Sequence, residues 1–224
     1  MFPRENVQST NVHAFPPPIQ SATLLPYMNS STSSADSSDK HFPYSEPAEP
    51  VLLRGSRFQV VRVQQPLAAG GFREREVVRH PGAVVLLPMV DDNHICLIRN
   101  YRISIRKTLI ELPAGTLEPG EPPIETAARE LVEETGFVAQ QLQLIHTYYP
   151  SPGVLDELMY LYVATGLTPG PAQREAGEEI DNLIVSWDEA LAMVDRGEIV
   201  DSKTLVGLLL FQRWRRHGTF PRRE

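Results

Sequence analysis

The chain has 224 residues, of which 42% are hydrophobic and 22% are charged. This length and composition allow one ordinary domain with an appendage, or two small domains, and exclude collagen-like, coiled-coil and wholly disordered proteins. The formal net charge of -7 gives no electrostatic reason for binding a polyanion, because that requires clustered Lys and Arg. We therefore expect no nucleic-acid partner.

The single cysteine, Cys96, cannot form an intramolecular disulfide, which fits a reducing compartment. No apolar run approaches the ~20 residues of a membrane span, so no membrane partner is expected. Residues 1–20 lack the basic start and apolar core of a signal peptide, and they are not Arg-rich as an organelle transit peptide would be. The sequence thus predicts a cytoplasmic protein.

Residues 1–50 differ in composition from the rest, since they hold eight of the 20 prolines and nine serines. Such a segment cannot offset its ordering entropy, so it is predicted to be a disordered Pro/Ser-rich tail. The favoured interpretation is an unstructured tail, or an upstream start with Met28 the true one, and the alternative is a docking peptide. Residues 51–218 are predicted to form the folded domain, with N-terminal strands at 51–80 and the core at 81–218.

Apolar and β-branched residues alternate or cluster from Val51 onward, which is typical of strands. A helix is expected from Pro122 to Thr135, because proline suits the first turn and Gly136 suits a left-handed C-terminal cap. The expected strands are 57–64, 73–80, 83–90, 94–100, 108–111, 142–149, 158–164 and 182–186, and the expected closing helices are 188–196 and 202–216. This order indicates an α+β domain with a mixed sheet between helices.

The helix predicted at 122–135 carries closely spaced glutamates. Glu130 and Glu134 are one turn apart on one face, with Glu133 beside them. Repulsion between such pairs is worth only about 0.2–0.5 kcal/mol, so it does not prove a site, but a divalent cation would neutralise it. Oxygen-only ligands select hard cations, and Mg2+ typically takes carboxylates, waters and substrate phosphates. The helix is therefore a candidate site for phosphate chemistry.

Two features near these glutamates support the same chemistry. Arg129 precedes Glu133 by four residues and can pair with it, which would orient the carboxylate. Gly115 and Gly120 allow the loop before the helix to fold sharply, so that the carbonyl of Ala114 can approach the same metal ions.

The segment from Gly115 to Phe137 resembles the Nudix box at every fixed position. It reads Gly, five residues, Glu121, seven residues, and then Arg-Glu-apolar-any-Glu-Glu-any-Gly-apolar. The chain is therefore similar to Nudix hydrolases. The resemblance implies a Nudix-type α/β/α sandwich, in which the box forms a loop, a helix and a loop. It also implies Mg2+ ions, for which Mn2+ can substitute, that activate water against a diphosphate.

The resemblance further implies a role for each residue of the box. The implied metal ligands are Glu130, Glu134, Glu133 and the backbone carbonyl of Ala114, and Glu133 is alternatively a catalytic base. The implied structural positions are Gly115, Glu121, Arg129 and Gly136.

Residues outside the box resemble the ADP-ribose pyrophosphatase subfamily. A Ser-Pro-Gly turn puts Pro152 sixteen residues beyond Gly136, and the stretches 99–115 and 196–204 are also similar. The likeness spans about residues 51–216 and implies cleavage of ADP-ribose to AMP and ribose 5-phosphate. The alternatives are hydrolysis of another nucleotide sugar such as GDP-mannose, or of a dinucleoside polyphosphate. A non-catalytic ADP-ribose-sensing module is a further alternative, although its usual correlate, a damaged box, is absent from this sequence.

The subfamily resemblance also implies substrate contacts, a base and an oligomeric state. The implied substrate-binding residues are Arg102, Pro152 and Glu157. The Pro, Gly and Glu-rich loop at 169–180 would supply the general base, for which Glu178 is chosen first and Glu179 next. A solvated Arg102 and a merely soluble acidic loop are the competing interpretations. Members of this kind pair through their N-terminal strands, so a homodimer is expected.

Overall fold

The computed structural model describes residues 49–174 and 179–217. Residues 1–48 of the predicted tail, the predicted base Glu178 and the predicted end of the domain at residue 218 lie outside this range. The division between a tail and a folded domain therefore stays a prediction.

The first described strands form a three-stranded antiparallel sheet of β1 (Val51–Arg54), β2 (Gln59–Pro66) and β3 (Phe72–Arg79). β2 and β3 pair along their whole length, from Gln59 opposite Arg79 to Pro66 opposite Phe72. β2 begins two residues later than predicted. The reason is a turn that joins it to β1, in which the Gly55 N–H donates to the Phe58 carbonyl at 2.8 Å.

The central sheet has the strand order β7-β4-β10-β9. Its strands are β7 (Ala114–Thr116), β4 (Ala83–Pro88), β10 (Met159–Thr165) and β9 (Gln141–Tyr148). β10 runs parallel to β4, and the other pairs are antiparallel, so the sheet is mixed as predicted. Every residue of β4 is buried, as its unbroken apolar run leads one to expect for a strand covered on both faces.

A second three-stranded sheet has the order β12-β5-β6. Its strands are β12 (Ile180–Ser186), β5 (His94–Arg102) and β6 (Lys107–Glu111), and a bridge between Met89 and Ile95 connects it to the segment after β4. Two short strands, β8 (Phe137–Val138) and β11 (Thr168–Pro169), pair beside the end of the first helix.

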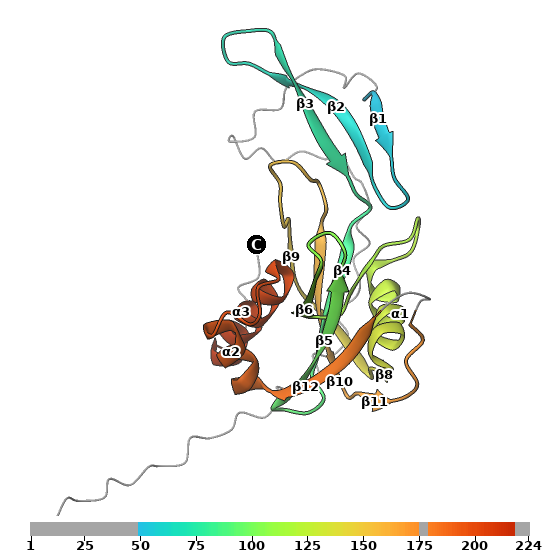
Figure 1. Ribbon diagram of the computed structural model, residues 1–224, viewed down its shortest axis with the longest axis vertical. Helices are drawn as coiled ribbons and strands as arrows, with labels where there is room; N and C mark the ends of the chain where they lie inside the picture. Colours follow the sequence, from blue (N-terminus) through green and yellow to red (C-terminus); the bar gives the residue numbers. More distant parts are fainter. Residues whose placement is uncertain (1–48, 175–178, 218–224) are drawn as a thin grey trace, which may run out of the picture. The chain divides into compact units, whose positions relative to one another are not determined.

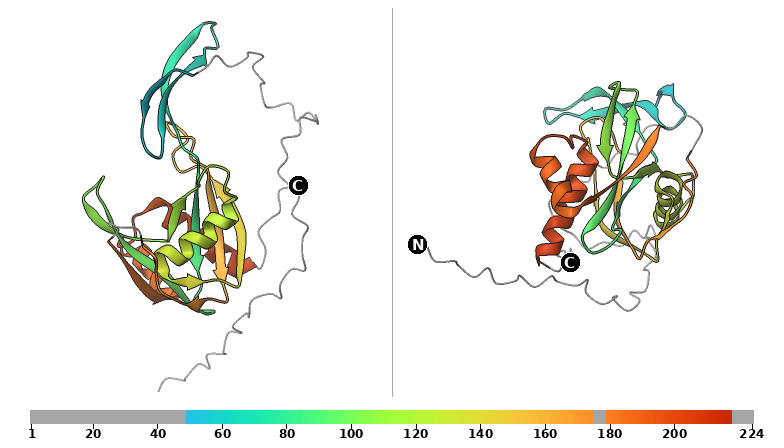
Figure 2. Two further views of the ribbon diagram at one scale, coloured as in Figure 1. Left: turned by 90° about the vertical axis from the view of Figure 1, so that its right-hand side faces the viewer. Right: turned by 60° about the horizontal axis from the view of Figure 1, so that its bottom comes forward.

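Helices cover the central sheet on both sides (Figures 1 and 2). The helices are α1 (Pro123–Thr135), α2 (Trp187–Asp195) and α3 (Ser202–His217). Val84 and Leu86 of β4 pack in one core with Leu131 of α1. Val85 and Leu87 pack in the other core, which also contains Trp187, Leu208 and Phe211 of α2 and α3. Since alternate residues of one strand face opposite helices, the fold is the predicted α+β domain with an α/β/α sandwich.

Helix α1 has the ends that its sequence predicts. Pro123 occupies the first turn, and Gly136 adopts a left-handed conformation with φ 77° while its N–H donates to the Val132 carbonyl. A side chain at Gly136 would also lie 2.5 Å from the Gly170 carbonyl oxygen, so only glycine fits this cap.

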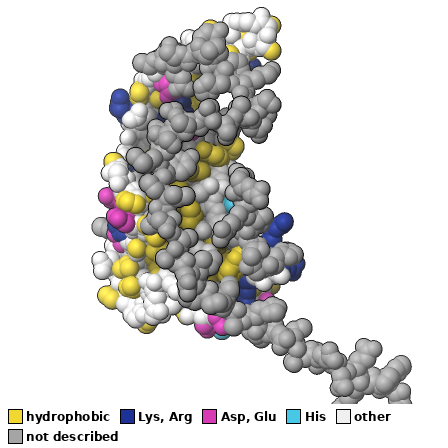
Figure 3. Space-filling view, turned by 180° about the vertical axis from the view of Figure 1, so that it is seen from behind, with side chains coloured by type: hydrophobic (Ala, Val, Ile, Leu, Met, Phe, Trp, Pro, Cys, Tyr) yellow, Lys and Arg dark blue, Asp and Glu magenta, His cyan; other side chains and the backbone are white. Residues whose placement is uncertain are grey.

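Large hydrophobic side chains remain exposed on the three-stranded sheet. Leu52, Leu53 and Phe72 are 45%, 51% and 53% exposed. Figure 3 shows hydrophobic side chains among charged ones on the face opposite to that of Figure 1. None of the helices within 49–174 and 179–217 is long and apolar enough to cross a membrane.

Candidate active site

Arg129 gathers three carboxylates around one guanidinium. Its Nε and Nη2 donate to the two oxygens of Glu121 at 3.2 and 3.1 Å. Its Nη1 donates to Glu130 Oε1 at 2.8 Å and to Glu133 Oε2 at 2.9 Å. The hydrogen bond to Arg129 is the main reason why the pKa of Glu121 lies below its ordinary value, and these carboxylates raise the pKa of Arg129. The side chains of all three glutamates are therefore held around one guanidinium beside α1.

Glu134 connects α1 to the loop that precedes it. This side chain is buried, and the Ala114 N–H donates to its Oε2 at 2.9 Å. Ala114 in turn pairs with Val85 of the central sheet. The structure thus brings together Glu134 and Ala114, which the sequence analysis assigned to one metal site.

Gly115 is required by the position of the Glu130 side chain. A Cβ atom at residue 115 would lie 1.8 Å from Glu130 Cδ and 1.9 Å from Glu130 Oε1. Because these separations are far below contact distance, any other residue would displace the carboxylate. The invariant glycine of the box therefore makes room for a glutamate one helix turn before Glu134.

The donor chemistry of this cluster fits a hard divalent cation. Four carboxylates, three of them around Arg129, and one guanidinium leave an excess of three negative charges, and all the donor atoms are oxygens. In the described part of the chain, however, no three His, Cys, Asp or Glu side chains are arranged to hold a metal ion. Arg129 contacts oxygens of both Glu130 and Glu133. A bound cation would have to replace or share these contacts.

Arg102, a predicted substrate contact, lies at the end of β5 and pairs with the last residue of β6. Its Nε and Nη2 donate to the two oxygens of Glu111 at 2.8 and 2.5 Å. Glu111 is fully buried, whereas the Arg102 side chain is 41% exposed. The contact with Glu111 is the main cause that raises the pKa of Arg102, and the charge of Glu134 adds to it. Arg102 is therefore within electrostatic range of Glu134.

Glu111 also accepts a hydrogen bond from Lys203 of α3. Burial alone would raise the pKa of Glu111, but the contacts with Arg102 and Lys203 outweigh it and hold the pKa below its ordinary value. Sequence reasoning assigned no role to Glu111 or Lys203. The sequence did contain a signal for this pairing, because a glutamate at the end of an apolar strand is rarely buried unless it is paired.

The loop after β9 carries the predicted substrate residues Pro152 and Glu157 and is fixed to β3. The Val78 N–H donates to the Val154 carbonyl at 2.8 Å, and Glu157 Oε1 lies 3.4 Å from His80 Nδ1. Pro152 is exposed within the turn. These contacts bring Glu157 to the end of β3. Glu157 is therefore not one of the carboxylates that contact Arg129, which are Glu121, Glu130 and Glu133.

Residues 170–174 cover the C-terminal end of α1. The Gly170 and Gln173 N–H groups donate to the Gly136 and Glu133 carbonyls at 2.7 and 3.1 Å. Arg174 Nε donates to the Glu134 carbonyl at 3.2 Å. The segment thereby satisfies carbonyls that a helix end leaves without partners. Of the two bases predicted on the loop at 169–180, Glu178 lies outside the described residues, and Glu179 is exposed just before β12.

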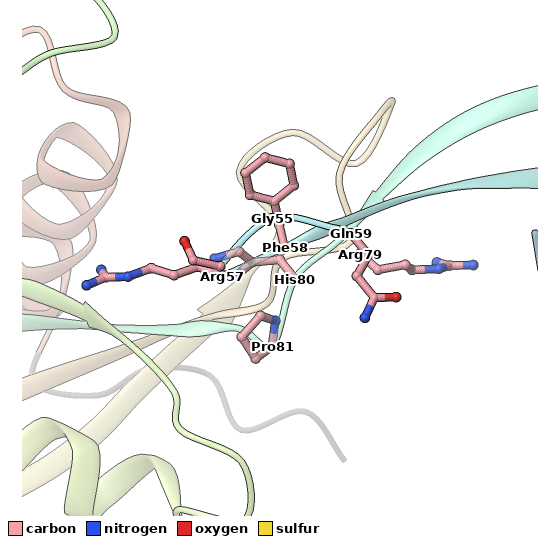
Figure 4. A pocket seen from close by; sticks show the side chains of 8 residues that line it. Gly55, Arg57, Phe58, Gln59, Arg79, His80 and Pro81 are labelled. Atoms are coloured by element: carbon pink, nitrogen blue, oxygen red, sulfur yellow. The ribbon is translucent and has the colours of Figure 1, made fainter. Parts of the chain in front are cut away.

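A separate pocket of about 380 Å³ lies where the three-stranded sheet joins the core. Residues of the β1–β2 turn and the end of β3 line it, including Phe58, Arg57, Arg79 and His80. Figure 4 shows the Phe58 ring standing away from the strand and the two arginines pointing in opposite directions. His80 belongs both to this pocket and to the contact with Glu157, so the pocket is adjacent to the loop that follows β9.

Residues 78–206 match the family profile described as NUDIX domain. An ADP-ribose pyrophosphatase of Mycobacterium tuberculosis is 41% identical over 162 residues, which are 70% of this chain and 78% of that protein. An ADP-ribose pyrophosphatase of Bacillus subtilis is 38% identical over 148 residues, or 65% and 80% of the two chains. A methanol dehydrogenase activator of Bacillus methanolicus is 39% identical over 158 residues, or 70% and 84%.

The fold also matches a solved structure. A crystal structure of an ADP compounds hydrolase aligns with a TM-score of 0.68, over 78% of this chain and 95% of that chain, at 24% sequence identity. At this identity the likeness shows the fold alone, and it agrees with the sandwich of α1, the sheets and α2–α3.

Proposed function

Because this chain belongs to the Nudix family, we propose that it hydrolyses the diphosphate bond of a nucleoside diphosphate sugar, with ADP-ribose as substrate and AMP and ribose 5-phosphate as products. The observation that carries this proposal is the carboxylate cluster of α1, in which Arg129 holds three glutamates while Glu134 binds the Ala114 N–H. Two relatives named ADP-ribose pyrophosphatase support the choice of substrate.

The proposed cofactor is Mg2+, with Mn2+ as a substitute. Glu130, Glu134, Glu133 and the Ala114 carbonyl would hold it, since they are hard oxygen donors with an excess of negative charge. Divalent ions lower the pKa of bound water and offset the charge of a diphosphate. Arg129 orients the carboxylates from the other side, because its guanidinium contacts three of them at once.

The remaining proposed roles are those that the resemblance to the subfamily implies. Arg102 would bind the diphosphate through the exposed edge of its guanidinium. Glu157 and Pro152 would contact the sugar from the loop after β9. A carboxylate would take the proton of the attacking water, and Glu178, then Glu179, remain the proposed bases, with Glu133 as the alternative on α1.

We further propose a homodimer in a reducing, cytoplasmic compartment. Exposed hydrophobic side chains on β1 and β3, including Leu53 and Phe72, support pairing through the three-stranded sheet. The buried, unpaired Cys96 is compatible with a reducing compartment. No nucleic-acid partner is proposed, because the net charge of the chain is -7. No membrane partner is proposed, because no apolar run of the sequence approaches the ~20 residues of a membrane span.

The deciding experiment incubates the purified chain with ADP-ribose and Mg2+ and separates the products by chromatography. We expect AMP and ribose 5-phosphate, and no reaction after chelation of the metal. GDP-mannose and a dinucleoside polyphosphate, run in parallel, test the other Nudix activities. Faster cleavage of either would reassign the substrate, and binding of ADP-ribose without any product would favour the sensing module.

The variant Glu134→Gln tests the metal assignment. Its side-chain carbonyl can still accept the hydrogen bond from Ala114, but its negative charge is lost. We expect turnover to fall by at least about 100-fold with little change in melting temperature. Glu125→Gln is the matched control, because Glu125 is exposed on the first turn of the same helix and should leave turnover unchanged. Near-normal turnover of Glu134→Gln would contradict the assignment.

A further inference from the structure

Four charged side chains form a largely buried network between β5, β6 and α3. Its centre is the fully buried carboxylate of Glu111, to which Arg102 and Lys203 both donate. Lys203 Nζ also lies 3.0 Å from Asp201 Oδ2, and its side chain is only 11% exposed. Two carboxylates and two cations make the network neutral. Arg102 is its most exposed member, and its guanidinium is the proposed contact with the diphosphate.

The same network fixes the backbone that leads to the active site. Asp201 Oδ2 accepts hydrogen bonds from the backbone and the hydroxyl of Thr204 at 3.0 and 2.6 Å. The Leu112 N–H donates to the Thr204 hydroxyl at 2.7 Å. The end of β6 is therefore tied to the start of α3 through a side chain at residue 111 and through the backbone at residue 112, just before Ala114.

Stability alone does not account for this arrangement. Replacing a buried ion pair with apolar residues is often neutral or stabilising, whereas removing one partner leaves an uncompensated buried charge. If Lys203 were neutral, the buried Glu111 carboxylate would depend on Arg102 alone. The guanidinium would then be drawn inward, and more of its positive charge would be offset before substrate arrived.

We propose that Lys203 is a positioning residue for substrate binding: it shares the charge of Glu111 and so leaves the outer edge of Arg102 available to the diphosphate. This inference rests on the proposed function and adds a residue of α3 that does not touch the substrate. Two N–H groups of Arg102 are used on Glu111, and a guanidinium has five. The remaining donors can bind phosphate oxygens only while the side chain keeps its present orientation.

The test compares Lys203→Met with Lys203→Arg in the full chain, using ADP-ribose and Mg2+. We expect Lys203→Met to raise KM about tenfold while kcat changes less than about threefold, because ground-state binding is what it weakens. Lys203→Arg retains the charge and should restore KM. Lys107→Met is the matched control, since Lys107 is exposed on β6.

A double-mutant cycle separates positioning from a structural effect. Arg102→Ala alone should raise KM, and adding Lys203→Met to it should change KM by less than about threefold. If the two substitutions raise KM independently, so that their factors multiply in the double variant, the inference is overturned, because Lys203 would then act without Arg102. Should Lys203→Met fail to fold, the pair Glu111→Gln/Lys203→Met keeps the network neutral and should fold. Because Glu111 then carries no charge that Lys203 has to share, KM should differ by less than about threefold from that of Glu111→Gln alone, and a larger difference would overturn the inference.

Binding measured without turnover distinguishes the two proposals. In a Glu134→Gln background, calorimetric titration with ADP-ribose should give a Kd about tenfold higher when Lys203 is replaced by Met. If the parent chain produces AMP but Lys203→Met keeps its KM and Kd, the positioning inference is wrong and the function stands. If the parent chain yields no AMP, the proposed function itself is wrong.

Discussion

Gly115 illustrates how a single residue without a side chain sets the geometry of the carboxylates. The Glu130 carboxyl occupies the space that a Cβ at residue 115 would need, with only 1.8 Å between the two positions. This close approach explains why the box begins with glycine although the residue does no chemistry. It also makes the activity more sensitive to a substitution at Gly115 than the place of this residue in a short strand suggests.

Replacing Gly115 with Ala should therefore damage activity more than stability. Glu130 has to turn away, and misplacing a reacting group by about 1 Å can reduce the rate on the order of 100-fold. Measurements of kcat with ADP-ribose and of the melting temperature test this. The control is Gly197→Ala: Gly197 has φ 70° and open space around its Cβ position. That variant should lose about 1 kcal/mol of stability and keep its activity, the opposite pattern.

The Glu111 carboxyl predicts a specific dependence of stability on pH. Its pKa is lower in the folded protein than the ordinary value of about 4.3, because Arg102 and Lys203 outweigh the effect of burial. The stabilisation is therefore fully present above that ordinary value and is lost as the pH falls through the folded value. We expect the free energy of unfolding to fall as the pH drops below that ordinary value, and Glu111→Gln to flatten this dependence. An unchanged slope in the variant would contradict the role of Glu111.

At the scale of elements, helix α1 depends on a loop for its C-terminal end. Its last turn contains no basic residue, so nothing within the helix complements the negative end of the helix dipole. Arg174 supplies this charge from outside, donating to the Glu134 carbonyl and, at 3.0 Å, to Asn182 Oδ1. The amide of Asn182 donates in turn to the Thr135 carbonyl at 2.8 Å. The glutamate helix is thus anchored at its C-terminal end by segments remote in sequence.

Arg174→Ala should consequently lower the free energy of unfolding by about 1–3 kcal/mol, as expected for a hydrogen bond from a charged group at a helix end. Thermal or urea unfolding measures the change. Arg213→Ala serves as the comparison, because Arg213 is exposed on α3, and should remain within about 0.5 kcal/mol of the parent. Equal stabilities of the two variants would mean that α1 does not need this cap.

At the scale of the whole molecule, the three-stranded sheet leaves hydrophobic side chains without cover. Leu53 and Phe72 are each about half exposed, although they lie on different strands of this sheet. A single hydrophobic residue on a surface needs no explanation, but several on one small sheet favour a protein interface. The proposed homodimer would bury them.

Phe72→Asp combined with Leu53→Asp should convert the proposed dimer to a monomer, because burying two carboxylates in an apolar interface is unfavourable. Sedimentation velocity at working concentration tests the prediction. Leu209→Asp provides the control, since Leu209 is 56% exposed on α3, away from this sheet, and should leave the mass unchanged. A monomeric parent chain would refute the dimer outright.

The sequence by itself determined the helix of the box and most elements of the fold. Hydrophobic periodicity and capping residues are local, so the ends of α1 and most strands were predicted within about two residues. The strands β1, β7, β8 and β11 were missed, because runs of two to four residues carry too little periodicity. The glutamates of the site were found for a related reason: their spacing on one helix fixes which face they share.

Only the tertiary structure decided which groups hold that helix and its neighbours in place. Glu111 and Lys203 are 92 residues apart in the chain, and Glu134 is 40 residues from Arg174. No local pattern connects such positions, because the path of the chain through the sheets brings them together. The sequence could therefore name the residues proposed for metal and phosphate chemistry, while the buried charges around Arg102 became visible only once β5, β6 and α3 were packed against one another.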